Sequence, residues 1–179
     1  MSQPETWLIR RVGRIQRVDL DWRRDRVRSA LRGDNPTALA RLPSSFAVMG
    51  DPQWLPGYCL LLTDDPDVER LSDLPNLRRL YLESMATLAV AVEGACRDAD
   101  PSFRRVNIEI LGNADAFLHT HIWPRYAWEP PELLRRPVWV YPAERWTDPV
   151  TALSSDQDVL RAAISSRLVA ASGQDSSQT

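Results

Sequence analysis

Residues 117–126 read FLHTHIWPRY, and this stretch holds both histidines of the 179-residue chain, His119 and His121. Its apolar and aromatic residues predict a strand over 118–123. Side chains two positions apart on a strand point to the same face, so we expect the two imidazoles to lie side by side. Histidine is the side chain best suited to nucleophilic or proton-transfer chemistry near neutral pH, and this strand is therefore the expected centre of chemistry.

Three interpretations of the histidine pair are open on the residues alone. In the first, both rings are hydrogen-bonded groups on a sheet surface. In the second they bind zinc, iron or manganese, which then needs a carboxylate or cysteine as third protein ligand, because the chain has no further histidine. In the third, one histidine is a nucleophile.

The composition excludes several other kinds of site. All 22 cationic side chains are arginine, so the chain has no lysine for a Walker-type phosphate loop, a Schiff base or a Ser-Lys pair. Cys59 and Cys96 stand in apolar surroundings and are expected to be buried free thiols. The sequence has no apolar run of membrane-span length and no signal-peptide pattern, which predicts a cytoplasmic protein with no membrane partner.

The charge is uneven, with ten arginines and five acidic residues in the first 41 positions. We interpret residues 1–40 as a basic, helical N-terminal extension. Asp19, Asp21 and Asp25 are interleaved with these arginines and no aromatic platform follows, so we expect a solvated helix face and no specific nucleic-acid binding.

The order of the predicted elements indicates an α+β domain, an antiparallel sheet of about five strands with one long helix packed on it, flanked by N- and C-terminal helical extensions. The long helix is expected to begin at Ser72 as N-cap. We place the main domain at 41–150, a C-terminal helix at 151–171 and a disordered tail at 172–179. The individual predictions are helices at 21–32, 72–99 and 155–171, and strands at 46–49, 58–62, 106–111, 118–123 and, shorter, 138–141.

Four ordered segments resemble the histidine-triad (HIT) superfamily of nucleotide hydrolases and transferases. They are NIEILGN (107–113), LHTHIWPRY (118–126), PGYCLLL (56–62) and LSDL (71–74), and together they span about residues 45–126. The family pattern is His-φ-His-φ-His-φ-φ, where φ is apolar, preceded by Asn and a Gly-Gln or Gly-Asn step. The resemblance implies a HIT-like fold of the diadenosine tetraphosphate hydrolase-like kind.

The resemblance also implies roles for individual residues. His119 matches the middle triad position, which attacks the α-phosphate and forms a nucleotidyl-histidine intermediate. His121 matches the last triad position and would donate a hydrogen bond to a phosphate oxygen. Asn107 and Asn113 match polar positions that contact phosphate.

Two further residues are weaker candidates for substrate binding. Arg125 either contacts phosphate or forms a salt bridge at the end of the strand. Asp51 lies near the position where family members place a polar group on the ribose. The resemblance implies no metal and no cofactor, and it implies a homodimer. Some of the clustered aromatic residues after the motif are expected to stack on a nucleobase or a partner, and at least half are expected to cover the sheet.

One departure from the family concerns proton transfer. Phe117 occupies the first triad position and Ala114 stands where many members carry Ser or Thr. Two functions therefore stay open. The first is a nucleotide hydrolase or nucleotidyl transferase acting on a dinucleoside polyphosphate or related conjugate through a nucleotidyl-histidine. The alternative is a non-catalytic nucleotide-binding protein.

Overall fold

The computed structural model describes residues 22–175, and the chain divides into two compact units between Pro36 and Thr37. The described part of the first unit contains helix α2 (Arg26–Arg32). The Asp25 side chain caps this helix by accepting from the Arg28 N–H, and Gly33 ends it in the left-handed conformation. Most of the predicted N-terminal extension and the end of the predicted tail lie outside the described residues.

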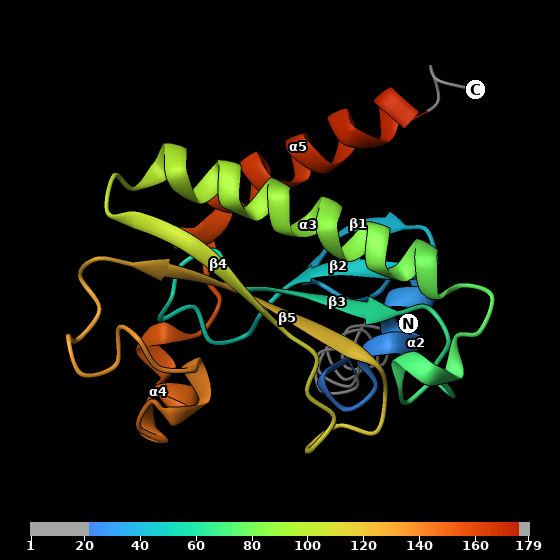
Figure 1. Cartoon of the computed structure of the whole chain (residues 1–179), viewed down its shortest axis with the longest axis horizontal. Helices are drawn as coiled ribbons and strands as arrows, with labels where there is room; N and C mark the ends of the chain where they lie inside the picture. Colours follow the sequence, from blue (N-terminus) through green and yellow to red (C-terminus); the bar gives the residue numbers. More distant parts are fainter. Residues whose placement is uncertain (1–21, 176–179) are drawn as a thin grey trace, which may run out of the picture. The chain divides into compact units, whose positions relative to one another are not determined.

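The second unit is built on a five-stranded antiparallel sheet of order β1-β2-β3-β5-β4 (Figure 1). The predicted α+β class, the sheet and its long helix are confirmed. Strand β5 carries the two histidines and lies between β3 and β4. The strands are β1 (Ala38–Leu42), β2 (Ser45–Met49), β3 (Cys59–Thr63), β4 (Phe103–Glu109) and β5 (His119–Tyr126).

Two strand predictions need correction. The strand predicted at 138–141 is a 3-10 turn, Val138–Val140, because Pro137 and Pro142 flank a segment too short to pair and the Val140 N–H bonds back to the Pro137 carbonyl. The fifth strand is instead β1, in a segment where the sequence predicts no strand. Its sequence, ALARL, has two alanines and no β-branched or aromatic residue, so its strand propensity is low and its pairing with β2 determines its conformation.

The start of the long helix also differs from the prediction. Helix α3 (Arg78–Ala99) begins six residues beyond Ser72, which lies in a 3-10 turn, Leu71–Asp73. In that turn the capping group is the Asp73 carboxylate, which accepts from the Arg70 N–H. Pro75 disfavours helical geometry at the residue before it, Leu74, and so separates the turn from the helix.

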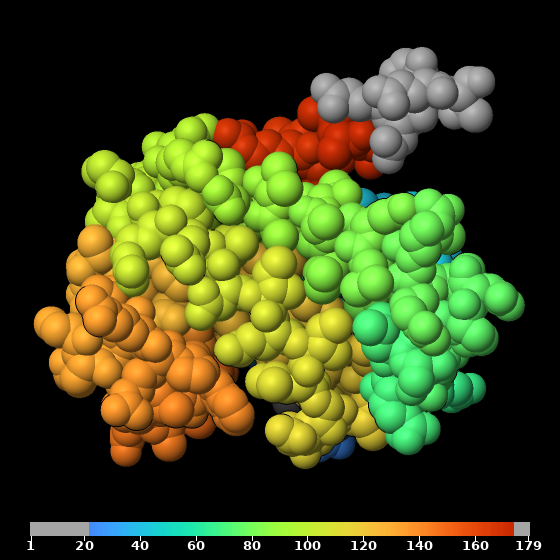
Figure 2. All heavy atoms as spheres, in the orientation of Figure 1, coloured from blue at the N-terminus to red at the C-terminus, as the bar shows by residue number. Residues whose placement is uncertain are grey.

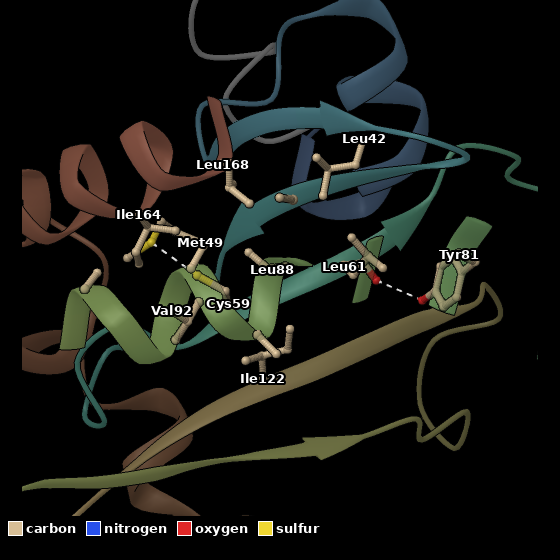
Figure 3. Packing of buried hydrophobic residues seen from close by; sticks show 14 of the residues in the cluster. Leu42, Met49, Cys59, Leu61, Tyr81, Leu88, Val92, Ile122, Ile164 and Leu168 are labelled. Carbon is tan, nitrogen blue, oxygen red and sulfur yellow. Dashed lines mark hydrogen bonds between the residues drawn. The ribbon is translucent and has the colours of Figure 1, made fainter. Parts of the chain in front are cut away.

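The core lies between the sheet and α3, with α5 (Asp158–Asp175) packed beside α3 (Figures 1 and 3). Figure 2 shows α3 (green) and α5 (red) forming a continuous surface.

The Tyr81 hydroxyl, from α3, bonds the Leu61 carbonyl at 3.2 Å and the Thr120 hydroxyl at 2.9 Å. Alternate residues of β3 and β5 thus face α3, which leaves the histidines on the opposite side. The largest buried core side chains include Tyr81, Met49, Leu61, Leu88, Leu118, Ile122, Ile164 and Leu168.

The C-terminal region contains short turns followed by α5. Between β5 and α5 the chain forms α4 (Glu144–Thr147) and three 3-10 turns, Val138–Val140, Pro149–Thr151 and Ser155–Gln157. Ser154 caps the last of these turns, and α5 continues to Asp175, beyond the end predicted for this helix. Across residues 22–175, no helix is both long and apolar enough to cross a membrane.

Candidate active site

His119 and His121 lie side by side on the face of β5 that points away from α3. Their ring centroids are 4.8 Å apart at an interplanar angle of 72°. Strand pairing places His119 opposite Leu62 of β3, and His121 between Leu60 of β3 and Glu109 of β4. We call this side of the sheet the histidine face, defined by His119, His121 and Trp123 of β5 and by Asn107 and Glu109 of β4.

The tautomer of His119 is set by the backbone. Its Nδ1 lies 2.8 Å from the carbonyl oxygen of Phe117, a group that only accepts hydrogen bonds. Nδ1 therefore carries the hydrogen, and the neutral ring keeps its lone pair on Nε2. The side chain is 5% exposed. Phe117 cannot relay a proton through its ring, but its carbonyl orients the neighbouring histidine.

His121 is oriented by a residue of another strand. The Tyr58 hydroxyl, just before β3, lies 2.8 Å from His121 Nδ1. When the phenol donates to Nδ1, the imidazole hydrogen is on Nε2 and can be donated to a phosphate oxygen. Burial and the neighbouring His119 lower the pKa of His121 to about 4, so the ring is neutral at physiological pH.

Tyr58 is held by close packing against Trp123 and Gly50. Its ring stacks on Trp123 with a centroid distance of 3.4 Å and an angle of 5°. On Gly50, a Cβ atom would lie 2.0 Å from Tyr58 Cδ1, so only glycine allows the ring its position. The buried Gln53 side chain ties this loop together, since its amide donates to the carbonyls of Gly50 and Tyr58 and accepts from the Gly57 N–H.

Strand β4 adds two polar side chains to the histidine face. Asn107 pairs with Trp123, and Glu109 pairs with His121; both are half-buried. Burial raises the pKa of Glu109, while the Arg125 charge and a hydrogen bond from the Trp123 side chain oppose that rise. Asn107, for which a phosphate contact was predicted, is therefore on the histidine face, and Glu109 adds a carboxyl group that was not predicted for the site.

Two of the other three predicted substrate contacts, Asn113 and Asp51, lie in loops. Asn113 is exposed in the loop between β4 and β5. Asp51 lies in the loop after β2, where its carbonyl accepts from the Leu153 N–H. The structure places Asn107 with the histidines on one sheet face, whereas the contacts predicted for Asn113 and Asp51 depend on loop positions and stay predictions.

Arg125 belongs to a buried ion pair. Its guanidinium contacts the Glu129 carboxylate at 2.8–3.0 Å and donates to the carbonyls of Leu133 and Arg136. Glu129 also accepts from the Tyr126 N–H and the Tyr141 hydroxyl. Of the two alternatives for Arg125, the structure has the salt bridge, which attaches the segment after β5 to the end of the strand.

Many of the clustered aromatic side chains pack on one another. Trp54 lies within 6 Å, centroid to centroid, of Trp123, Tyr141 and Trp146. Trp128 and Trp139 are about half exposed. In the described part of the chain, no three or more His, Cys, Asp or Glu side chains are grouped as a metal site would require.

Tyr58 and Glu109 were not among the residues predicted for the site. Tyr58 is in PGYCLLL, one of the four segments that carry the resemblance, so its polar ring was an available signal. Glu109 is within the quoted 107–113 motif, and its spacing from Asn107 places both on the same face of a strand.

Structural comparison relates this arrangement to known proteins, whereas no family model and no curated protein matches the sequence. A histidine triad protein from Marinobacter aquaeolei has a TM-score of 0.59 at 19% identity, covering 73% of this chain and 87% of that protein. One from Bradyrhizobium japonicum has a TM-score of 0.55 at 21% identity, covering 73% and 89%. A hypothetical histidine triad nucleotide-binding protein from Sulfolobus tokodaii has a TM-score of 0.57 at 12% identity, covering 79% and 90%. The chain therefore has the fold of the histidine-triad proteins.

Proposed function

We propose that this chain is a member of the HIT superfamily and that it hydrolyses or transfers nucleotidyl groups, with His119 as nucleophile. The observation that carries the proposal is the hydrogen bond between His119 Nδ1 and the Phe117 carbonyl, which leaves Nε2 as the ring's lone-pair atom. A neutral imidazole with a free Nε2 is a competent nucleophile near pH 7.

The covalent step fits the charges of the site. Attack of Nε2 on the α-phosphorus forms a P–N bond and releases the leaving group, and the imidazole then carries a positive charge. The Phe117 carbonyl, already accepting from Nδ1–H, stabilises that charge. His121 Nε2–H and the Asn107 amide would donate to phosphate oxygens, and fixed donors of this kind are typically worth about 10²–10³ in rate.

We propose a dinucleoside polyphosphate, nucleoside phosphoramidate or adenylylated molecule as substrate. Support comes from the four-segment resemblance and from the name of the Sulfolobus tokodaii protein, which describes it as nucleotide-binding. All three substrate classes share a nucleoside α-phosphate joined to a leaving group, which is the part that His119 would attack.

A non-catalytic nucleotide-binding protein is the second candidate. It is favoured by Phe117, whose side chain cannot protonate a leaving group, and by Ala114, which supplies no hydroxyl.

An activity assay decides between the two candidates. It measures the turnover of a panel of the three proposed substrate classes by the wild type and by His119→Asn. The enzyme proposal expects turnover that the variant lacks, and a nucleotidyl adduct on the wild type, detected by intact-mass spectrometry after an acid-free quench. Nucleotide binding by calorimetry with no turnover of any panel member supports the second candidate. His119→Asn must retain the wild-type circular dichroism and thermal midpoint. Activity lost to a chelator and regained with zinc or manganese would instead support the metal interpretation.

We also propose a homodimer, as the resemblance implies. Strand β4 is an outer strand of the sheet, and its Ile108 side chain is 42% exposed, which leaves a partly apolar edge for a second copy. Light scattering after size exclusion should give the mass of two chains, and a monomer mass at micromolar concentration contradicts the proposal.

A further inference from the structure

Glu109 is the one acidic residue within the five strands that the structure describes. It is the last residue of β4 and pairs directly with His121. Directly opposed residues of antiparallel strands have Cβ atoms about 4.5–5.5 Å apart, on the same face. The carboxyl group of Glu109 is thus carried next to the imidazole pair, on the side of the sheet where a phosphate would bind.

The aromatic stack that orients His121 also borders Glu109. Tyr58 and Trp123 stack face to face, and the Tyr58 hydroxyl bonds His121. Trp123 is fully buried on the same sheet face, and its side chain opposes the rise that burial causes in the pKa of Glu109. Glu109 is itself half-buried beside this stack.

The groups facing Glu109 favour its protonated form. His121 is neutral, since its pKa is lowered to about 4, and burial raises the pKa of Glu109 itself. Arg125 is the opposing charge, but its guanidinium is paired with Glu129. A bound phosphate next to Glu109 would add negative charge and favour the protonated carboxyl further.

We propose that Glu109 is the general acid and base of this site, in place of the histidine that Phe117 replaces. This inference rests on the proposed function. In the first step the His119 Nε2–P bond forms, the bond from phosphorus to the leaving group breaks, and the leaving group takes the Glu109 proton. In the second step water attacks phosphorus, its proton passes to the Glu109 carboxylate, and the P–N bond breaks to restore neutral His119.

Asp115 is the rival carboxylate, since it lies in the exposed loop between β4 and β5. It is on a loop whereas Glu109 is on a strand, so the structure positions Glu109 more firmly. The two residues are separable by matched variants, Glu109→Gln and Asp115→Asn, each of which keeps size and removes the titrating group.

The experiment compares single-turnover rates for two adenylyl substrates that differ in leaving group. One leaves as p-nitrophenolate, which needs no proton, and the other as an alkylamine from a phosphoramidate, which does. Glu109→Gln should lower the first-step rate by about 10²-fold or more with the amine and by less than about 3-fold with the phenol. With the phenol substrate it should give a burst of one product per site followed by slow turnover, because the second step also lacks its base.

Two further variants complete the test. Glu109→Asp should retain the wild-type preference between the leaving groups at a reduced rate. If Glu109→Gln folds poorly, this variant still tests whether the reaction requires a carboxyl group at position 109. Glu83→Gln, at an exposed position of α3, should behave as the wild type. The pH profile of the amine reaction should lose its alkaline limb in Glu109→Gln.

Equal first-step losses with both leaving groups, or none, would overturn the inference while leaving His119 as nucleophile. The inference would also be overturned if Asp115→Asn, and not Glu109→Gln, slowed the amine reaction and left the phenol reaction nearly unchanged. A wild-type protein that forms neither adduct nor product contradicts the proposed function itself, and the two failures are therefore distinguishable.

Discussion

The hydroxyl of Tyr58 lies 2.8 Å from Nδ1 of His121, although 63 positions separate the two residues in the sequence. This contact does for His121 what the Phe117 carbonyl does for His119: it binds one ring nitrogen and leaves the other toward the histidine face. The two histidines thus have different partners, one a backbone carbonyl and one a side chain that is itself held in a stack. Substitutions can test the second partner without touching either histidine.

Tyr58→Phe should keep the stack on Trp123 and remove only the hydroxyl. His121 then loses the partner that fixes its tautomer, and we expect turnover to fall about 10-fold, the equivalent of one hydrogen bond of about 1.4 kcal/mol. Steady-state kinetics with the best panel substrate measures this. Tyr81→Phe is the matched control, because it removes a hydrogen-bonded hydroxyl on the α3 side of the sheet and should lower stability without lowering kcat. An unchanged kcat/KM in Tyr58→Phe contradicts the positioning role.

Gly50→Ala should displace the Tyr58 ring, since the new Cβ would lie 2.0–2.9 Å from three atoms of that rigid ring. We expect a loss of about 1–3 kcal/mol in the free energy of unfolding, together with lower activity. Urea denaturation and the kinetic assay measure the two effects. Gly173→Ala is the control, because a Cβ there meets nothing within 4 Å in helix α5 and alanine favours helix. A Gly50→Ala protein as stable and active as the wild type would show that the ring is not confined there.

The stability of the protein should fall in acid partly through His121. Its pKa is about 4 in the folded chain against an ordinary value of 6.5. Between these values the unfolded chain binds a proton that the folded chain does not, so the contribution is present above pH 6.5 and is lost as the pH falls toward 4. The upper limit is about 3 kcal/mol. The difference in unfolding free energy between the wild type and His121→Asn, measured from pH 7.5 to 4, should change by an amount of this order. A difference that stays constant across that range contradicts the lowered pKa.

Local patterns were sufficient to predict that His119 and His121 lie on one face of a strand. The two-residue spacing of His119 and His121 requires a shared face on any strand, and β5 is a strand. The buried run of β3 and the apolar spacing of α3 were recognisable for the same reason, because burial imposes a period on the sequence. These features depend on neighbours along the chain.

The features that were missed depend on residues far apart in the sequence. Strand β1 exists because β2 pairs with it, and no pattern inside ALARL reports that partner. Tyr58 becomes a site residue only when β3 and β5 pair and bring it to His121. The segment 138–141 has strand-forming residues, but two prolines keep it in a turn whose Val138 side chain is buried.

Arg125→Met should cost about 3–5 kcal/mol of unfolding free energy, because it leaves the buried Glu129 carboxylate without its cation. Arg79→Met is the matched control: its partner Glu83 is exposed on α3, and such pairs contribute about 0–1 kcal/mol. Urea denaturation of both variants at pH 7 gives the comparison.

The double variant Arg125→Met/Glu129→Leu should lose less unfolding free energy than the sum of the losses in its two single variants. It removes both charges and leaves only the Tyr126 N–H and the Tyr141 hydroxyl to find new partners. A loss below about 1 kcal/mol in Arg125→Met, with weaker nucleotide binding, would instead return Arg125 to the phosphate contact predicted from the sequence.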